Sequence, residues 1–374
     1  MTGDTMAAEP QLSVTGLGKS FSEEFELSGV DVTVGTDEIV ALLGPSGCGK
    51  TTALRCIAGV ESTDAGSIRV GGDLVEGDGV SLSPEARDVG MVYQNYAIWP
   101  HKSVYGNVVF PLKHAAHDIP SDRHEARVEE VLELVEIGDL KDSPATDLSG
   151  GQQQRTALAR SLVHDPGLLL LDEPLSNLDK GLRKHMRDEL QRLQHEIGVS
   201  MLYVTHDQEE AFYLADRILV MRDGEVVERG TPRELYDRPK SSFTRQFVGD
   251  RNKFTGTVQT APDGERVVDA GFLTFPLSGT DYVSDDVGQG SVRCFVRPAD
   301  VSIGRFDPGG TDILEVTGTV VADGLLGERY EVTVQFDKTD LIVHTETERA
   351  FQRGDEITIY FEPGSIQVYD ASDR

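Results

Sequence analysis

A glycine-rich segment is the first place in this sequence where residue types and spacing could do chemistry. Residues 44–51 read GPSGCGKT and match the phosphate-binding pattern G-x-x-x-x-G-K-[ST]. Glycines let consecutive backbone N–H groups turn toward phosphate oxygens, and the N-terminus of a following helix attracts the same anion. We expect Lys50 to bridge the β- and γ-phosphates of a nucleoside triphosphate and the Thr51 hydroxyl to hold Mg²⁺.

The segments on either side of this loop are the ones that such a loop needs. Residues 38–43 (EIVALL) have the pattern of a buried strand, and residues 52–58 (TALRCIA) begin a helix. The strand–loop–helix order supports the motif, because the alternative, a glycine-rich turn with a chance lysine, does not require those neighbours.

Two adjacent acids end another predicted strand. The leucines at 168–171 are followed by Asp172 and Glu173. An apolar strand that ends in acids buries costly charge unless a metal ion or a water needs them. We expect Asp172 to hold Mg²⁺ through water and Glu173 to polarise the attacking water. The alternative is a surface acidic pair after a strand, which is common.

A second helix N-terminus follows the sequence LSGGQ at residues 148–152. Ser149 fits an N-cap, and Gly150 and Gly151 open the predicted helix 152–163, which offers another anion site. One nucleotide does not need two such sites in one chain, so the pattern predicts two chains facing head to tail. The alternative is a plain capped helix start.

Three further polar residues lie directly after predicted strands or acids. Gln94 follows the strand 89–93, where its amide could meet both Mg²⁺ and the attacking water. His206 follows the strand 200–205, where an imidazole could bind the γ-phosphate, although a lone histidine at a strand end is more often structural. Asp179 ends the polar turn SNLD at 176–179.

The chain predicts two kinds of architecture in succession. Strands and helices alternate through residues 11–250, which indicates an α/β sheet, and residues 124–135 and 181–197 show helical spacing. From residue 254 onward, short alternating strands punctuated by Gly, Pro and Asp predict a small β-barrel. We therefore expect a flexible tail at 1–10, an α/β domain at 11–250 and a β domain at 251–374.

Composition limits the classes of partner. The chain has 374 residues with 64 acidic and 35 basic side chains, a net charge of −29. This acidity argues against nucleic acid or an anionic lipid surface as the main partner. It is the composition of a protein kept soluble in high salt, so we hypothesise a halophilic archaeal source; the alternative is an ordinary acidic cytosolic protein.

Cysteine usage and hydropathy narrow the setting further. The 3 cysteines show no paired spacing, which fits a reduced cytoplasm rather than a disulfide framework or a metal site. The sequence has no run of about 18 apolar residues that would span a membrane.

Taken in order, these motifs make the chain resemble the ATP-binding subunit of an ABC transporter over residues 11–250. The resemblance implies that residues 44–51 are Walker A, 148–152 the signature, 168–172 Walker B, and 176–179 the D-loop. It implies catalytic roles for Glu173, His206 and Gln94, and an adenine-stacking role for Phe21. The residues expected to contact ATP are Phe21, Gly44, Pro45, Ser46, Gly47, Cys48, Gly49, Lys50, Thr51, Thr52, Gln94, Asp172, Ser149, Gly150, Gly151, Gln152 and Asp179, and those expected to hold Mg²⁺ are Thr51, Gln94 and Asp172.

The C-terminal region resembles the small OB-like (TOBE) domain appended to many importer ATPases, on the segment RPADV at residues 297–301. The resemblance thus implies an α/β P-loop NTPase domain of the ABC cassette type at 11–250 with a helical subdomain at about 95–165, followed by a small all-β OB-like (TOBE) barrel.

The resemblance also implies partners and a place in the cell. We expect a dimer with a second ATPase subunit that sandwiches two ATP molecules, separate membrane permease subunits that contact residues 95–101, and an extracytoplasmic substrate-binding protein. The chain would lie at the cytoplasmic face of the cell membrane as a peripheral ATPase, an ABC-type translocase.

Three alternatives stay open at this point. The segments QQQR at 152–155 and YAIWP at 96–100 look most like importers of ferric iron, polyamines or thiamine, but maltose- or pentose-type sugar importers share nearly everything else. A soluble ABC ATPase of DNA repair or translation would carry long coiled-coil insertions or tandem cassettes, which this sequence lacks. A third possibility is a regulatory module in which the barrel senses a ligand.

Overall fold

The computed structural model describes residues 9–22, 25–114, 119–249, 252–303, 313–327, 329–346 and 351–372, without the side chains of residues 21, 22 and 25. Most of the tail predicted at 1–10 therefore lies outside the described residues. The chain divides into two compact units, Met1–Pro232 and Arg233–Arg374. The predicted domain boundary, between residues 250 and 251, lies later in the chain than this division.

A mainly parallel sheet forms the centre of the first unit, with strand order β11-β10-β3-β9-β8-β7. Strands β10, β3, β9, β8 and β7 pair in parallel, and β11 is an antiparallel edge strand. Since parallel strands end on the same side, the residues after β3, β7, β8 and β9 meet at one edge of the sheet. The strands are β3 (Ile39–Leu43), β7 (Val89–Val92), β8 (Leu168–Asp172), β9 (Ser200–Thr205), β10 (Arg217–Arg222) and β11 (Glu225–Gly230).

A second, antiparallel sheet has the order β2-β1-β4-β5-β6. Leu12, Val32, Ile57 and Leu170 belong to one buried cluster, so this sheet, helix α1 (Lys50–Ala58) and the parallel sheet share a core. The strands are β1 (Leu12–Ser22), β2 (Phe25–Val34), β4 (Ala65–Val70), β5 (Asp73–Gly77) and β6 (Val80–Ser81).

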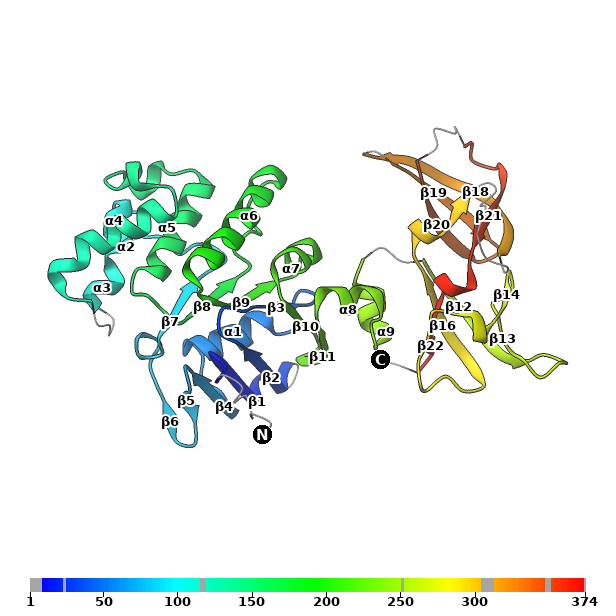
Figure 1. Ribbon diagram of the computed structural model, residues 1–374, viewed down its shortest axis with the longest axis horizontal. Helices are drawn as coiled ribbons and strands as arrows, with labels where there is room; N and C mark the ends of the chain where they lie inside the picture. The colour runs from blue at the N-terminus through cyan, green and yellow to red at the C-terminus, as the bar shows by residue number, and fades with distance from the viewer. Residues whose placement is uncertain are drawn as a thin grey trace, which may run out of the picture. The chain divides into compact units, whose positions relative to one another are not determined.

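Four helices, α2 to α5, lie where the sequence predicted a helical region. Figure 1 shows α2 to α5 grouped together, and they fall within residues 104–162. The helices predicted at 124–135, 152–163 and 181–197 are present as α4, α5 and α6, with ends shifted by two residues or fewer. The helices are α2 (Val104–Val108), α3 (Phe110–His114), α4 (His124–Leu134), α5 (Gly150–Leu162), α6 (Lys180–Ile197), α7 (Gln208–Leu214), α8 (Pro232–Asp237) and α9 (Ser242–Phe247).

The second unit is the predicted OB-like β domain, and its strands form two sheets around one core. One sheet has the order β14-β13-β12-β16-β22-β15 and the other β17-β21-β18-β19-β20. Every pairing is antiparallel except that of β15 with β22. Phe254, Val292, Val332 and Ile359, from both sheets, share one buried cluster. The strands are β12 (Asn252–Thr260), β13 (Arg266–Asp269), β14 (Thr274–Pro276), β15 (Tyr282–Val283), β16 (Gly290–Val296), β17 (Ser302–Ile303), β18 (Leu314–Leu326), β19 (Arg329–Phe336), β20 (Thr339–Thr345), β21 (Glu356–Phe361) and β22 (Gln367–Asp370).

The segment around α8 and α9 is tied to this β domain by side chains. Arg297 donates to the carbonyl oxygen of Tyr236 at 2.6 Å, and its guanidinium lies 3.6 Å from the centre of the Tyr236 ring. The Tyr369 hydroxyl donates to the carbonyl oxygen of Pro239 at 2.7 Å. These contacts explain why residues 233–249 group with the β domain.

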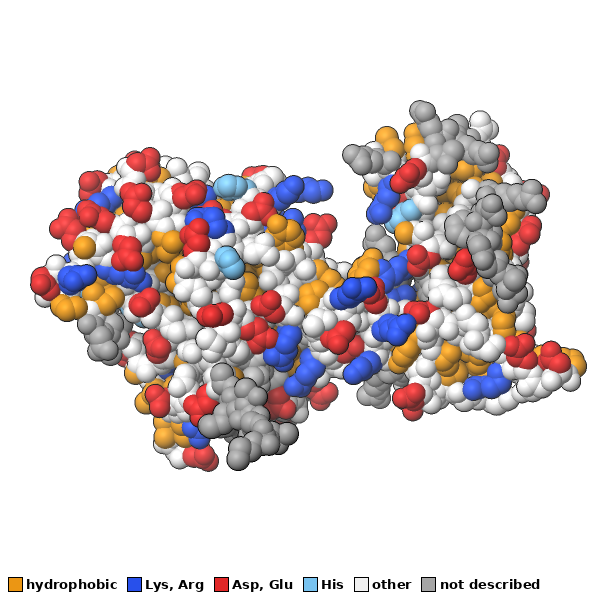
Figure 2. Space-filling view, viewed as in Figure 1, with side chains coloured by type: hydrophobic (Ala, Val, Ile, Leu, Met, Phe, Trp, Pro, Cys, Tyr) orange, Lys and Arg blue, Asp and Glu red, His pale blue; other side chains and the backbone are white. Residues whose placement is uncertain are grey.

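The surface carries the acidity that the composition predicted. Figure 2 shows Asp and Glu side chains spread over the visible face of each unit rather than gathered in one patch. Among the described residues, no helix has both the length and the apolar character that crossing a bilayer requires.

Candidate functional site

The phosphate loop (residues 44–51) lies between the buried strand β3 and helix α1. A Cβ on Gly44 would collide with the carbonyl oxygen of Met221, so the loop can turn there only with glycine. Gly47 and Gly49 have φ values of 83° and 104°, which L-residues avoid. Gly49 is the N-cap of α1 and brings no side chain to it. The first backbone N–H groups of α1 are thus left for an anion.

The other side chains of the loop differ in how far they are exposed to solvent. Ser46 is exposed and Pro45 is half-buried, while Cys48 is only 3% exposed and packs in the core. Burial raises the pKa of the Cys48 thiol, and the neighbouring Lys50 opposes this. Thr52 is half-buried in the first turn of α1.

Lys50 lies across its own loop. Its Nζ donates to the carbonyl oxygens of Gly44 at 2.8 Å and Pro45 at 2.9 Å, and the residue is only 3% exposed. Its third donor makes only a long contact of 3.8 Å with Cys48 Sγ, which a phosphate oxygen could replace. This position fits the predicted role of Lys50 as a phosphate ligand.

Thr51 and Asp172 meet where a magnesium ion would be expected. The Thr51 hydroxyl donates to Asp172 Oδ1 at 2.7 Å, although 121 residues separate the two in sequence. Burial raises the pKa of Asp172, which is 3% exposed, while the Thr51 hydrogen bond lowers it. A hydroxyl and a carboxylate beside a phosphate loop are the oxygen donors that Mg²⁺ prefers.

Glu173 is held between two of the predicted catalytic residues. Its Oε1 lies 3.0 Å from His206 Nδ1, and its Oε2 accepts a 3.0 Å hydrogen bond from Gln94 Nε2. The backbone of Glu173 has φ of 44°, and its N–H donates to the carbonyl oxygen of Val204. The ends of β7, β8 and β9 thus bring Gln94, Glu173 and His206 together.

The signature segment forms a complete helix cap. The Ser149 hydroxyl accepts from the Gln152 N–H at 3.4 Å, and Gln152 Oε1 accepts from the Ser149 N–H at 2.9 Å. This is a capping box, which positions the start of α5 firmly. Gly150 is exposed, whereas a Cβ on Gly151 would lie 3.3 Å from the Leu182 side chain.

The turn after Glu173 is held by hydrogen bonds within the chain, and the ATP contact expected of Asp179 stays a prediction. The Asp179 carboxylate is the N-cap of α6 and accepts from the N–H groups of Gly181 and Leu182 at 3.0 and 3.1 Å. Asn177, which the sequence analysis did not single out, donates to the backbone carbonyl of Gln94 at 2.9 Å. It therefore fixes the strand end that carries Gln94.

A second residue missed by sequence reasoning is Arg183 on α6. It donates to the carbonyl oxygen of Leu178 and to the carboxylate of Asp207, both at 3.1 Å. Asp207 directly follows His206 and caps α7. Arg183 lies in a helix rich in charged residues, so the sequence alone did not indicate that it would join Leu178 to Asp207.

Two predictions concern aromatic side chains: an adenine contact at Phe21 and a permease contact at residues 95–101. The side chain of Phe21 lies outside the described residues, so its adenine contact stays a prediction. In the region after Gln94, Tyr96 is buried, at 6% exposure, whereas Ile98 and Trp99 are half-buried. Of the residues 95–101 expected to contact a permease, Tyr96 therefore offers little surface, and the permease contact itself stays a prediction.

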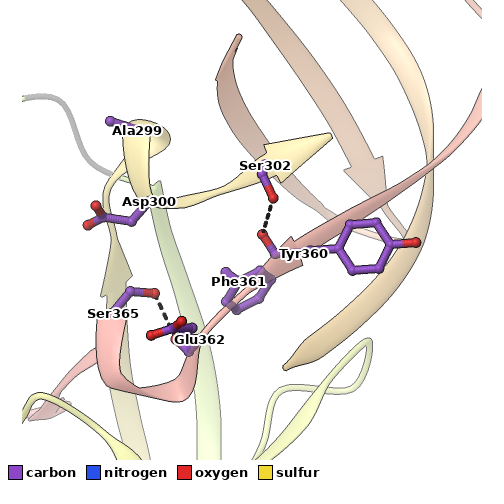
Figure 3. Close-up of a pocket in the computed structure, with 7 residues that line it drawn as sticks. All are labelled: Ala299, Asp300, Ser302, Tyr360, Phe361, Glu362 and Ser365. Atoms are coloured by element: carbon purple, nitrogen blue, oxygen red, sulfur yellow. Dashed lines mark hydrogen bonds between the residues drawn. The ribbon is translucent and has the colours of Figure 1, made fainter. Parts of the chain in front are cut away.

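The β domain has hollows of its own. One hollow, of about 230 Å³, is lined by the turn at Asp300, by β17, and by the end of β21 with the following Glu362 (Figure 3). A neighbouring hollow of about 490 Å³ shares Asp300 and Glu362 and also contains Arg297. The first is smaller than the roughly 300–1,000 Å³ of ordinary small-molecule sites. A ligand-sensing role for this domain stays a prediction.

Comparison with known proteins agrees with these features. Residues 27–176 match the family model for ABC transporters, and residues 294–368 match the model for the TOBE domain. The chain is 40% identical over 341 residues to a spermidine/putrescine import ATP-binding protein of Thermobifida fusca, covering 90% of this chain and 86% of that one. It is 39% identical over 348 residues to a xylose/arabinose import ATP-binding protein of Haloferax volcanii, covering 91% and 87%.

A third relative is named for the import of a different solute. An Fe(3+) ions import ATP-binding protein of Vibrio cholerae is 37% identical over 341 residues, covering 89% of this chain and 92% of that one. The described fold also resembles cbiO1 from Clostridium perfringens, part of an ABC transporter complex, with a TM-score of 0.54, 29% identity, and coverage of 61% and 90%.

A dimeric ATP-binding cassette in a post-hydrolysis state, bound to ADP and Pi, is similar as well, with a TM-score of 0.52 and 27% identity. It covers 59% of this chain and 99% of that one, as expected if only the first unit corresponds. The chain belongs to the family of ABC transporter ATP-binding subunits, the ATPases of importers, and carries a C-terminal TOBE domain.

Proposed function

We propose that this chain binds Mg²⁺–ATP at the phosphate loop and hydrolyses it at Glu173 to drive solute import through separate permease subunits. The observation that carries this proposal is the Glu173 carboxylate, held at 3.0 Å from both Gln94 Nε2 and His206 Nδ1. A carboxylate in that position can take a proton from an attacking water while the two neighbours keep it oriented.

Different residues of the chain would carry out different parts of phosphoryl transfer. Lys50 and the N–H groups at the start of α1 bind the phosphates, and Thr51 and Asp172 would hold Mg²⁺, which when bound neutralises charge on the phosphates. Gln94 and His206 orient Glu173 and the water it activates. Positioning and charge neutralisation supply most of the rate acceleration in such reactions.

The active unit is a head-to-tail dimer, in which the Ser149 end of α5 from one chain completes the ATP site of its partner. Support comes from the capping box at Ser149, which leaves a positive helix end facing outward from a rigid cap. The dimeric cassette among the similar structures, bound to ADP and Pi, also supports it.

Mixing two inactive variants tests the shared site. Lys50→Ala disables the phosphate loop, and Ser149→Asp keeps an N-cap but places a negative charge where the γ-phosphate would dock. A mixed dimer contains one site with an intact loop and an intact cap, so the mixture should regain ATPase activity that neither variant has alone. Lys50→Ala mixed with Thr51→Val is the matched control, because both changes lie on the loop. Activity that does not return in the first mixture would contradict the shared site.

The transported solute is proposed to belong to the polyamine or ferric iron class, with a pentose-type sugar as the second candidate. Relatives named for polyamine, sugar and iron import are similar to this chain at 40%, 39% and 37% identity, so the ATPase itself discriminates little between these cargoes. Selectivity then lies with the permease and an extracytoplasmic binding protein.

Uptake measurements decide between these classes. Cells that lack this gene are compared with the same cells carrying either the wild-type gene or the Glu173→Gln gene, using labelled putrescine, ferric iron and xylose. The cognate solute is the one whose uptake falls in the deletion and returns only with the wild-type gene. Restoration by Glu173→Gln would show that transport does not depend on this hydrolysis.

The place of the protein is proposed to be the cytoplasmic face of the cell membrane, bound to permease subunits at residues 95–101. Trp99 and Ile98 remain half-buried there and can contribute apolar surface. Trp99→Ala should weaken assembly with the permease more than it weakens ATP binding.

We further propose that the chain is adapted to high salt, because a net charge of −29 repels itself unless ions screen it. Thermal unfolding in low and in molar salt tests this. Full stability without salt would contradict it.

A further inference from the structure

A buried arginine joins the signature helix to the segment that carries Gln94. Arg160 lies on α5 and is only 7% exposed. Its Nη1 donates to the carbonyl oxygen of Ala97 at 2.7 Å, and its Nη2 donates to that of Tyr96 at 2.8 Å. The guanidinium also lies 4.9 Å from the centre of the Trp99 ring. Two carbonyls and an aromatic face thus hold a charge that has been removed from water.

The two carbonyls belong to a strained turn. Tyr96 and Ala97 have φ values of 59° and 46°, in the left-handed region that residues with a Cβ avoid. A residue in this conformation is strained and persists only where its surroundings over-determine it. The planar fork of Arg160 supplies that constraint, because it binds both carbonyls of the turn at once.

One end of this segment reaches the reaction centre. Gln94, two residues before Tyr96, donates its amide N–H to Glu173, and its backbone carbonyl accepts from Asn177. The other end continues to Trp99, whose backbone N–H donates to the side chain of Asn107 at 2.9 Å. A displacement of Gln94 therefore also moves the turn at Tyr96 and Ala97, whose carbonyls Arg160 binds.

Arg160 is fixed to the Ser149 end of α5 by the helix itself. Figure 1 shows α5 lying beside α2 and α4, and the helix runs unbroken from the capping box to Leu162. A hydrogen-bonded helix of 13 residues moves as one body. A shift at Tyr96 and Ala97 must therefore turn or translate the Ser149 end.

We propose that Arg160 is a positioning residue that couples the nucleotide of one chain to the site it completes in the partner. When Gln94 responds to ATP on its own chain, Arg160 passes that displacement to α5, and the Ser149 end is reoriented toward the partner's ATP. This inference rests on the proposed function, since it requires Gln94 to meet ATP and α5 to complete a second site.

Trp99 gives a direct readout of this contact. It is the only tryptophan of the chain, and its ring lies against Arg160 and 4.4 Å from the ring centre of Phe110. Its fluorescence emission in the full-length protein therefore reports the Arg160 contact without any label.

The test compares Arg160→Met and Arg160→Lys with the wild type. In the wild type, Mg²⁺–ATP should change the Trp99 emission. Arg160→Met should shift the basal emission to longer wavelength, abolish the ATP response, and lower kcat by about 10- to 100-fold, the effect of a small misplacement of reacting groups. KM for ATP should change less than about threefold, because the phosphate loop is untouched. Arg160→Lys should recover part of kcat, since it restores the charge without the planar fork.

A matched control is available close to Arg160, at the C-terminal end of the same helix. Arg127 on α4 donates to the carbonyl oxygens of Val163 at 3.1 Å and Leu162 at 3.2 Å. Arg127→Met removes the same kind of contact from α5 and should lower the melting temperature, while kcat and the ATP-induced change of emission stay at wild-type values. The proposal is overturned if Arg160→Met keeps the emission response and kcat within twofold, or if Arg127→Met loses both equally.

The proposed function is tested separately in the same experiment. Lys50→Ala must lose ATP hydrolysis; if it does not, the nucleotide site is wrong whatever Arg160 does. If Lys50→Ala is inactive and Arg160→Met behaves like wild type, the nucleotide site stands and the coupling through Arg160 is wrong.

Discussion

Replacement of Glu173 by glutamine gives the sharpest prediction for the reaction. The two side chains have the same shape, and Gln at this position can still accept a hydrogen bond from His206 Nδ1. The Gln94 amide can rotate to present its oxygen to the new amide N–H. The fold of the strand end is therefore expected to survive, and what is lost is the negative charge and the ability to take a proton.

The size of the effect follows from that loss. A positioned general base contributes about 10²- to 10⁴-fold to a rate. At about 1.36 kcal/mol per factor of ten, this corresponds to about 2.7–5.4 kcal/mol of lost transition-state stabilisation. Lys50, Thr51 and Asp172 do not contact Glu173 through any hydrogen bond found in the described chain, so KM for ATP should stay within about threefold.

The assay is steady-state hydrolysis of Mg²⁺–ATP, together with the mass of the protein in solution with ATP bound. Glu173→Gln should accumulate an ATP-bound dimer that the wild type consumes. Glu209→Gln is the control, because Glu209 is an exposed carboxylate on α7, paired with Arg187, three residues beyond His206. A Glu173→Gln variant that hydrolyses ATP within threefold of the wild type would refute the assignment of the base.

The remaining predictions concern single residues that support the site. Burial raises the pKa of Asp172, so the unfolded state loses this proton at a lower pH than the folded one. Stability without Mg²⁺ therefore falls as the pH rises above the unfolded value, and Asp172→Asn should raise the melting temperature at neutral pH while it lowers Mg²⁺ affinity. Arg87, 1% exposed, pairs with Glu76 and donates to the carbonyl oxygens of Leu82, Cys56 and Ile57. Arg87→Met should lower the free energy of unfolding by about 3–5 kcal/mol in urea titrations, and adding Glu76→Leu should recover part of it, because the unpaired buried charge is removed. Asp179→Ala should lower that free energy by about 0.5–2 kcal/mol through loss of the α6 cap, and Asp179→Ser should not.

The parts of the site that depend on local backbone chemistry could be predicted from the sequence. The strand predicted at 200–205 is β9, Ser200–Thr205, because its apolar run ends where the polar His206 begins. Ser149 was predicted as an N-cap, and the structure adds the reciprocal bond that the Ser149 N–H donates to the Gln152 side chain. Glycines 47 and 49 adopt the positive φ that the loop motif implies. Each of these features is set within about ten residues of chain.

Contacts between distant segments could not be predicted in this way. Arg160 reaches carbonyls 63 and 64 residues away, and Arg87 reaches the end of α1 about 30 residues away. Backbone carbonyls carry no sequence signal, so nothing in the residue pattern identifies the acceptor. For Arg160 a partial signal was present, because it is a charged residue within the otherwise mostly apolar segment TALARSLV at 156–163.

The distribution of backbone strain supports the assignment of the reaction centre independently of any motif. Ten non-glycine residues in the described chain have positive φ, and six of them are aspartates, a residue type that tolerates this conformation in turns. The other four are Tyr96, Ala97, Glu136 and Glu173. Three of these four lie on the segments that bring Gln94 and Glu173 together. Strain of this kind is retained where the geometry of a few side chains must be held. We therefore infer that the strained residues at the ends of β7 and β8 lower the stability of the fold and hold the side chains of the reaction centre in place.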